Sequence, residues 1–482
     1  MLEEGRIAVI LDGLDEIPRD LRPAVLRALS QQATFRLVLL TRSAEMAGAA
    51  ARAVLQGAAA IELQDIGLAA AADYLTRTQL DPPPRGWHEL TSRLRQEPGS
   101  PLAQALNNPL MLTLVRDTYR AGDDVGELLS LRDAAGHAAA AEDITGHLLD
   151  RVLPAAYTRQ PGEPPLRYDL PAAERALRCI ATRMNTDGAR DLQWWHIPAW
   201  THAVPRVIAT WLGAVLAAGL MGRIASGIVG GLALAFWSGI VLGIVGGLLA
   251  GIAFGRGNKI PKRIAPVRWR QLFRRRPLVV GLLAGLAAAS PAGLPGVAAR
   301  LGAVLAVGVV AWLGVGLLAG MSRPGADNTS PLSPLSSWRS DQAVGLAAGL
   351  AAALAAALAA GLYAGLRNGL PPGSAAAWGI RFGLVAGLYA GFVYPQSWSS
   401  SLAFAQLAAS ARTPVRLMRF LEDARSRGVL RTVGPIYQFR HARLQDRLAL
   451  QEPATGHNPC EPRSPTGDAA APTVEAPSAS AK

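Results

Sequence analysis

The stretch IAVILDGLDEIP, residues 7–18, joins a short apolar segment to a cluster of acids. Its apolar half has the composition of a buried β-strand, which ends at Asp12 and is followed by Asp15 and Glu16. In open α/β sheets the ligand crevice lies outside the carboxyl ends of the strands, where carboxylates can serve Mg²⁺-nucleotide chemistry. The alternative is an acidic turn that merely follows a core strand.

As a Walker B segment, this stretch gives each acid a role. Asp12 is the metal candidate, because it would hold Mg²⁺, usually through water. Glu16, with Asp15 beside it, is the catalytic candidate that orients or deprotonates the attacking water. The expected cofactors are ATP or ADP and Mg²⁺.

Three motifs occur in an order that resembles the NACHT branch of the signal-transduction P-loop NTPases. The pattern hhhhDGLDE at residues 8–16 is similar to the family's Walker B, and RLVLLTR at residues 36–42 resembles its sensor 1 strand. LNNPLMLTL at residues 106–114 resembles the start of its helical subdomain. The resemblance implies a parallel α/β sheet, with Arg42 at the nucleotide and Pro109 against its base.

A fourth match lies near the end of the chain. FRHARLQDRLA, residues 439–449, resembles the family's winged-helix ending F-x-H-x-x-x-Q-[ED]-x-x-A. The resemblance implies that His441 contacts the β-phosphate of ADP in the resting form. The alternative for a lone histidine is a satisfied core residue.

The phosphate-binding loop of such a domain is missing from the sequence. None of the three lysines, Lys259, Lys262 and Lys482, ends a G-x-x-x-x-G-K-[ST] pattern. Only six residues precede residue 7, so the sequence predicts an amino-terminal truncation, with weak nucleotide binding or none. A degenerate, non-hydrolysing relative is the alternative, and enzymatic activity stays undecided.

Charge divides the chain into two halves. The formal net charge is +13, but residues 1–204 carry −5 and the remainder +18. No Asp or Glu occurs between Asp191 and Asp327, where basic residues flank long apolar runs. That pattern is typical of a membrane protein and not of a nucleic-acid-binding face, so we expect a lipid bilayer as a partner and no nucleic acid.

Six apolar runs predict a polytopic transmembrane bundle, because about 18 apolar residues suffice to cross a bilayer. The runs are residues 207–221, 228–254, 278–294, 301–321, 343–366 and 375–394. Residues 256–276 carry nine basic residues and are expected on the cytoplasmic side, which also places the amino- and carboxyl-terminal parts in the cytoplasm. The predicted location is therefore the inner or plasma membrane of a bacterium.

Small residues recur along these runs, as in the pairs Gly345/Gly349 and Gly361/Gly365. Such pairs let helices approach closely and pack without polar groups. Mid-membrane charges of the kind that transporters use are nearly absent, which favours an anchor and a homo-oligomerisation bundle over a transporter.

The predicted fold is an α/β P-loop NTPase fragment with helical and winged-helix subdomains and an inserted all-α transmembrane bundle. Three short strands are expected, the third at residues 60–63. The predicted parts are a nucleotide-binding fragment (1–80), a helical subdomain (81–135), the first winged-helix part (136–204), the bundle (205–395), the second winged-helix part (396–451) and a disordered tail (452–482).

Because the winged-helix subdomain would be interrupted by the bundle, the helix at residues 171–186 should pack on the helix at 441–450. The two cysteines, Cys179 and Cys460, lie far apart in the sequence and predict neither a disulfide nor a metal site. The function expected from these patterns is a membrane-anchored NACHT-type signalling switch. The alternative is a polytopic scaffold or channel-like protein with a degenerate ATPase remnant.

Overall fold

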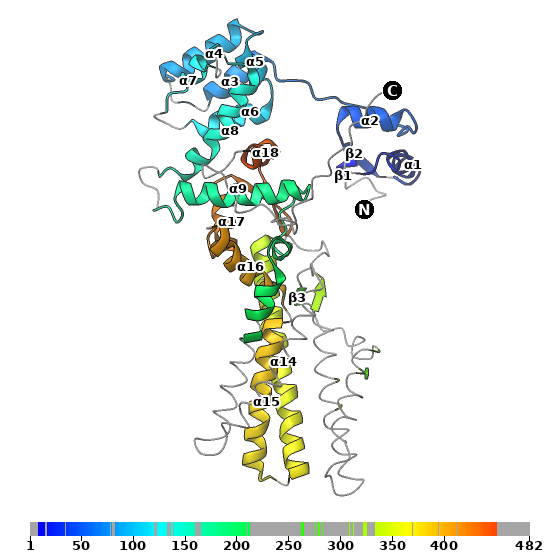
Figure 1. Ribbon diagram of the computed structural model, residues 1–482. Coiled ribbons are helices and arrows are strands. Elements are labelled where there is room, and N and C mark those ends of the chain that lie inside the picture. Colours follow the sequence, from blue (N-terminus) through cyan, green and yellow to red (C-terminus); the bar gives the residue numbers. More distant parts are fainter. Residues whose placement is uncertain are drawn as a thin grey trace, which may run out of the picture. The chain divides into compact units, whose positions relative to one another are not determined.

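The computed structural model describes most of residues 8–212 and 333–450 (Figure 1). Within these ranges the residues that are not described are 15–16, 34, 78, 80–81, 120–122, 133–135, 138, 160–164, 210, 369, 394 and 412. Between the two ranges the structure describes residues 262–264, 275, 278–279, 282, 308, 312 and 322–324. The chain forms two compact units, residues 1–112 with 125–130 and residues 113–124 with 131–482. The predicted tail at 452–482 lies outside the described residues.

The first unit begins with one β-α-β element followed by a helix. Its members are β1 (Ala8–Asp12), α1 (Arg22–Gln32), β2 (Arg36–Leu40) and α2 (Ser43–Ala50). The two strands are parallel and in a register that sets Asp12 beside Leu40. The predicted pair of parallel strands joined by a crossover helix is therefore confirmed.

This small sheet is covered on one face. Leu14, Leu26 and Ala49 form a buried cluster between the strands and the two helices. On the other face Ile10 is 65% exposed and Val38 46% exposed. The prediction of a buried strand is wrong in this respect, because none of the described elements covers this face of the sheet.

The rest of the first unit is helical. It contains α3 (Leu68–Arg77), α4 (Arg85–Gln96), α5 (Pro101–Ala105), the start of α6 (Pro109–Thr118) and α7 (Glu127–Ser130). Residues 60–63, expected to be a third strand, form none, since no described strand lies beside them to share backbone hydrogen bonds. Ile61 and Leu63 are accordingly almost fully exposed.

The second unit contains a helical head with a β-hairpin. Its elements are α8 (Ala141–Tyr157), α9 (Leu170–Thr186), a short 3₁₀ turn η2 (Ile197–Trp200), α17 (Leu417–Ser426), β5 (Leu430–Val433), β6 (Ile436–Phe439) and α18 (Ala442–Leu450). Residues 417–450 thus run in the order helix, turn, strand pair, helix. Gly428 ends α17 with a φ of +76°, and the N–H of Val429 reaches back to the carbonyl of Ala424, which is a Schellman-type end.

Helices α9 and α18 lie against each other although 255 residues separate the end of one from the start of the other, Thr186 from Ala442. Arg190 donates two hydrogen bonds, of 2.8 and 3.0 Å, to the carboxylate of Asp446. The buried Gln445 amide donates to the side-chain oxygen of Asn185 at 2.6 Å and to the carbonyl of Ala189 at 3.0 Å. The predicted packing of residues 171–186 on residues 441–450 is confirmed.

One expectation of the sequence-based analysis is wrong. Cys179 on α9 is disulfide-bonded, although the two cysteines were expected to form no disulfide.

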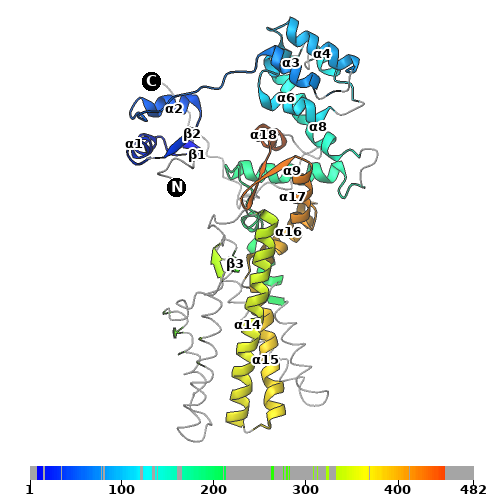
Figure 2. The same cartoon turned by 180° about the vertical axis from the view of Figure 1, so that it is seen from behind.

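Two long apolar helices form a hairpin in the second unit (Figures 1 and 2). They are α14 (Pro334–Asn368) and α15 (Pro372–Val393), and α16 (Gln396–Ala411) follows them. Among the described residues these two helices are long and apolar enough to span a membrane. They match the last two predicted runs, whereas the first four, between 207 and 321, lie outside the described residues apart from a few positions, so a six-helix bundle stays a prediction.

The hairpin is held together by close backbone approach. A Cβ added at Gly349 would lie 2.9 Å from the carbonyl oxygen of Gly387, and one at Gly361 would lie 3.3 Å from that of Ala375. A Cβ at Gly383 would lie 2.5 Å from the carbonyl oxygen of Ala353. The expectation that small residues allow close helix approach is confirmed for this pair of helices.

An aromatic cluster joins the hairpin to the head of the second unit. Trp194, fully buried, makes edge-to-face contacts with Trp195 at 5.5 Å and with Trp338 of α14 at 4.8 Å between ring centroids. Trp338 in turn stacks on Phe404 of α16. Trp194 and Trp195 are therefore core residues.

A second short sheet lies beside the hairpin. Strands β3 (Lys262–Ile264) and β4 (Ser322–Pro324) are antiparallel, and β3 lies next to α14.

Candidate functional site

Two of the predicted site residues come to one edge of the first-unit sheet. Asp12 is the last residue of β1 and is exposed, and Gly13 follows it with a φ of +91°, which turns the chain away from the strand. Strand β2 runs in the same direction, so its successors Thr41 and Arg42 emerge at the same edge. Arg42 then begins α2 as its N-cap residue.

Asp15 and Glu16, the predicted catalytic acids, lie outside the described residues. Among the residues that the structure does describe, no three His, Cys, Asp or Glu side chains gather as a metal-binding group. A single carboxylate at a strand end suits a water-bridged Mg²⁺, which takes few protein ligands, and Asp12 is such a group.

Pro109 begins α6, as the family resemblance implies. The side-chain oxygen of Asn108 accepts the N–H of Met111 at 3.0 Å and so caps the helix. The neighbouring Asn107 amide donates to Asp65 at 3.1 Å, and its carbonyl accepts the N–H of Ile66 at 2.7 Å. Both asparagines therefore hold the entry to α6, which accounts for the Asn-Asn-Pro sequence without a ligand.

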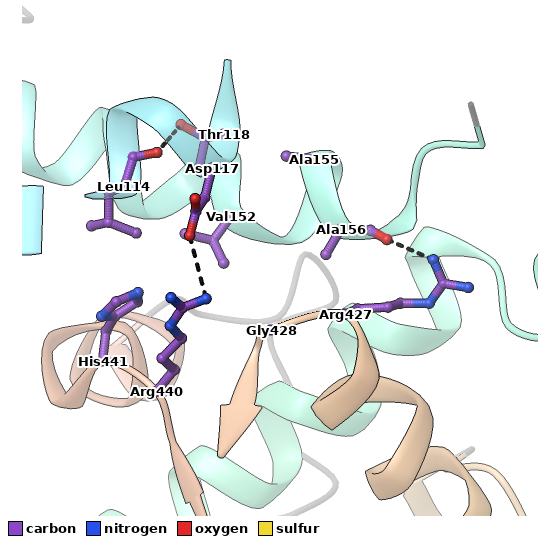
Figure 3. A pocket seen from close by; sticks show the side chains of 10 residues that line it. All are labelled: Leu114, Asp117, Thr118, Val152, Ala155, Ala156, Arg427, Gly428, Arg440 and His441. Atoms are coloured by element: carbon purple, nitrogen blue, oxygen red, sulfur yellow. Dashed lines mark hydrogen bonds and ion pairs between the residues drawn. The ribbon is translucent and has the colours of Figure 1, made fainter. Parts of the chain in front are cut away.

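His441 lines a cavity within the second unit (Figure 3). The cavity has a volume of about 190 Å³ and lies between the last turns of α6, the end of α8 and the loops at both ends of the β5–β6 hairpin. Its walls are formed by Leu114, Asp117, Thr118, Val152, Ala155, Ala156, Arg427, Gly428, Arg440 and His441.

The His441 ring is buried and partly unsatisfied. The residue is 6% exposed, and its Nδ1 has no hydrogen-bond partner among the described residues. Burial, aided by the nearby Arg440 and Arg431 and opposed by Asp117, lowers the pKa of His441 to about 4. The imidazole is therefore neutral at pH 7 and can offer one ring nitrogen to a ligand.

Two arginines and one acid complete the polar lining of the cavity. Arg440 forms an ion pair with Asp117 at 3.3 Å (Figure 3). Arg427 donates to the carbonyl of Ala156 at 2.9 Å and to the carboxylate of Asp423 at 3.0 Å. Each of the two guanidinium groups is paired with a carboxylate, so their charges are balanced, and the neutral His441 ring is left to offer a nitrogen to a ligand.

The sequence identified only one member of this lining. His441 stood out because of its flanking motif, in which Arg440 is a variable position. Asp117 and Arg427 carry no sequence signal, since an Asp near a helix end and an Arg at a helix C-terminus are ordinary surface features.

Of the predicted site residues, Asp12 and Arg42 thus lie at one edge of the first-unit sheet. His441 lines a cavity together with Arg440 and Asp117, and Pro109 lies at the start of α6. Comparison with known proteins adds nothing to this picture: no family model, no curated protein and no solved structure matches the chain.

Proposed function

We propose that the chain is a membrane-anchored, NACHT-type NTPase signalling switch. In this proposal ADP holds a closed state, and exchange for ATP lets the protein open and self-associate. The observation that carries the proposal is the parallel register of β1 and β2, which brings Asp12 and Arg42 to one edge of the sheet. Nucleotide sites of open α/β sheets are found at this edge.

The proposed roles follow the chemistry of each group. Asp12 would hold Mg²⁺, which neutralises charge on the phosphates, and Glu16 with Asp15 would position and deprotonate water. Arg42 would offset phosphate charge, and Pro109 would pack on the base. His441 would give a neutral ring nitrogen to the phosphate end of ADP, which its burial and its unpaired Nδ1 support.

The membrane part of the proposal rests on α14 and α15. Along α14, Leu346, Leu350, Leu354 and Leu358 form a ladder in which each side chain is between 55% and 72% exposed. Such a long exposed apolar face suits lipid or neighbouring transmembrane helices better than water. We propose a multi-pass protein of the inner or plasma membrane whose terminal parts are cytoplasmic, as a homo-oligomer.

The second candidate is a polytopic scaffold or channel-like protein whose ATPase remnant is degenerate. The exposed leucine ladder of α14 is compatible with it, because a scaffold needs the membrane hairpin but no nucleotide. The two candidates share the membrane hairpin and differ in whether nucleotide binding depends on Asp12 and His441.

Nucleotide titration of the full chain in a neutral detergent tests the first candidate. We expect weak ADP binding, with a Kd on the order of 1 mM, that is strengthened by Mg²⁺. Asp12→Asn should remove the effect of Mg²⁺ on ADP binding. His441→Gln should weaken the binding of ADP more than the binding of ATP. Matched controls are Asp20→Asn and His88→Gln, which change exposed residues of the same types.

Translation of the DNA upstream of Met1 in frame gives an independent test. A G-x-x-x-x-G-K-[ST] loop within roughly 100 residues supports the switch, and Glu16→Gln in that longer chain should then abolish hydrolysis but keep binding. Unchanged turnover in Glu16→Gln would refute the role of Glu16. An in-frame stop, together with no nucleotide binding by the chain, would overturn the switch in favour of the scaffold.

A further inference from the structure

A single charge lies within α15, far from both ends of the helix. Arg381 is the only charged residue of α15; residues 372–380 precede it and residues 382–393 follow it in the helix. At a rise of about 1.5 Å per residue, Arg381 lies about 14 Å from the start of α15. The apolar core of a bilayer is about 30 Å thick, so a spanning α15 holds Arg381 close to the middle of the membrane.

The geometry of the helix turns Arg381 away from α14. Gly379 and Gly383 are buried, and a Cβ added at either would overlap the backbone of α14, at Ala357 or Ala353. Arg381 is two residues from each glycine, which places it about 160–200° around the helix, on the opposite face. Arg381 is partly exposed there, and it makes no hydrogen bond or ion pair among the described residues.

The chain itself supplies no carboxylate at this depth. Residues 192–326, which include the other predicted crossings, contain no Asp or Glu. The only acid of α14 is Asp341, which is buried and accepts the N–H of Ser397 at 2.7 Å. The level of Arg381 along α14 is that of Ala357, about 24 Å further along the helix than Asp341. The countercharge for Arg381 therefore has to come from outside the chain.

A second copy of the chain does not supply this countercharge, because its crossings have the same sequence. Two copies that met at this face would bring like charges together in a medium of low dielectric constant. Lipid phosphate is another source of negative charge, and it suits arginines near a helix end, which reach the headgroups by snorkelling. Arg381 is far from both ends of α15, so an acidic residue of another membrane protein fits it best.

We propose that the outer face of α15, the face around Arg381 that is turned away from α14, binds a transmembrane helix of a different protein that carries an Asp or Glu near its middle. Charged groups inside membranes pair with one another. Trp378, Leu384 and Leu388 lie three or seven residues from Arg381 on the same face, and each is between 40% and 46% exposed. These apolar side chains would pack on the partner helix around the ion pair.

This proposal rests on the membrane location of α14 and α15 proposed above, and it does not depend on nucleotide binding. It makes the partner a protein of another sequence, whose acidic residue is as costly in the membrane on its own as Arg381 is. Each charge therefore favours the association of the two helices, because pairing removes the cost of both.

The test uses the full chain in neutral detergent and two synthetic helices. Each helix is a fluorescently labelled peptide of about 20 Leu and Ala residues, one with Asp at its centre and one with Asn. A central position meets the middle of α15 in either orientation of the peptide. Fluorescence anisotropy gives the Kd of each peptide.

Three variants accompany the wild type. Arg381→Leu removes the charge from α15, and Arg381→Lys keeps it. The matched control is Arg339→Leu, which removes the same charge from an exposed position at the polar start of α14.

We expect the wild type to bind the Asp peptide at least about tenfold more tightly than the Asn peptide, because only the carboxylate neutralises the guanidinium group. This preference should disappear in Arg381→Leu and persist in Arg381→Lys and Arg339→Leu. Equal affinity of the wild type for the two peptides would overturn the proposal without any variant. A preference that survives in Arg381→Leu would also overturn it.

Two further measurements separate the proposal from its alternatives. Phosphatidylglycerol added to the micelles should leave the preference for the Asp peptide unchanged. Loss of the preference with phosphatidylglycerol, but not with phosphatidylcholine, would assign Arg381 to lipid phosphate and overturn the partner helix. Recovery of the wild type in the soluble fraction of cells would instead overturn the membrane location itself, so failure of the partner site and failure of the anchor are distinguishable.

Discussion

At the scale of single residues, His441 makes the stability of the second unit depend on pH. Its pKa is about 4 in the folded protein and about 6.5 when unfolded. The unfolded chain therefore binds more protons between these values, so stability is complete above about pH 6.5 and falls as the pH drops towards 4. The loss has an upper bound of about 3 kcal/mol.

The measurement is the unfolding temperature between pH 7.5 and 5 for the wild type and for His441→Gln, whose side chain does not titrate. We expect the wild type to lose more stability on acidification than the variant. His88→Gln, at an exposed position, should follow the wild type. Parallel curves for the wild type and His441→Gln would show that His441 is not the group that titrates.

Two neighbouring residues of α18 make contacts that differ in burial: those of Gln445 are buried and those of Asp446 are exposed. Gln445→Ala leaves the Asn185 side chain and the Ala189 carbonyl without their donor, which should cost about 1–3 kcal/mol. Asp446→Asn weakens an exposed ion pair with Arg190 and should cost at most about 1 kcal/mol. Chemical denaturation of the full chain checks the order, and a larger loss in Asp446→Asn would contradict it.

At the scale of elements, the α14–α15 hairpin depends on glycine at chosen positions. A Cβ at Gly379 would overlap the backbone carbonyl of Ala357, and backbone cannot move aside as a flexible side chain can. Gly379→Ala should therefore force the helices apart and destabilise the hairpin by about 1–3 kcal/mol.

The control for this prediction lies on the same helix. An added Cβ at Gly373 meets nothing within 4 Å, so Gly373→Ala should leave the hairpin intact. Thermal unfolding in detergent and hydrogen exchange of α14 and α15 report the difference. Equal exchange rates in the two variants would show that the close approach at Gly379 is not needed.

Local pattern was sufficient to predict those elements whose signal is local. Strands β1 and β2 and the apolar helices α14 and α15 all carry their pattern in their own sequence. Residues 60–63 show the limit, because an apolar segment becomes a strand only where a neighbouring strand accepts its hydrogen bonds.

Contacts between distant segments were predicted only where a motif linked them. The family resemblance led to α9 packing on α18, and the structure bears out that packing. The Asp117–Arg440 ion pair was not predicted, because its two residues come together only after the chain has returned to α6. No local pattern encodes such a meeting.

At the scale of the whole molecule, the pairing of β3 with β4 constrains how many times the chain between them can cross a membrane. Strands β3 and β4 pair beside α14, so the chain leaves and returns to one place over residues 265–321. A segment that starts and ends on one side of a membrane crosses it an even number of times. The two crossings predicted for that segment lie outside the described residues and stay a prediction.

The side of the membrane that faces the head of the second unit is open to a direct test. A hairpin that crosses twice puts the turn before α15 on the opposite side from α16. Ser374→Cys lies at that turn and Ser410→Cys near the end of α16, and both positions are exposed. Positive residues are retained in the cytoplasm, so a membrane-impermeant maleimide should label Ser374→Cys in intact cells and Ser410→Cys only after permeabilisation.

The two other outcomes have distinct meanings. Labelling of Ser410→Cys alone in intact cells would invert the orientation and place Cys179 in an oxidising compartment, where its disulfide is more usual. Equal labelling of both positions under all conditions would show that α14 and α15 do not cross the membrane. The unsubstituted chain gives the background labelling. Because the basic loops favour one orientation and the disulfide of Cys179 favours the other, the label decides between two opposing physical signals.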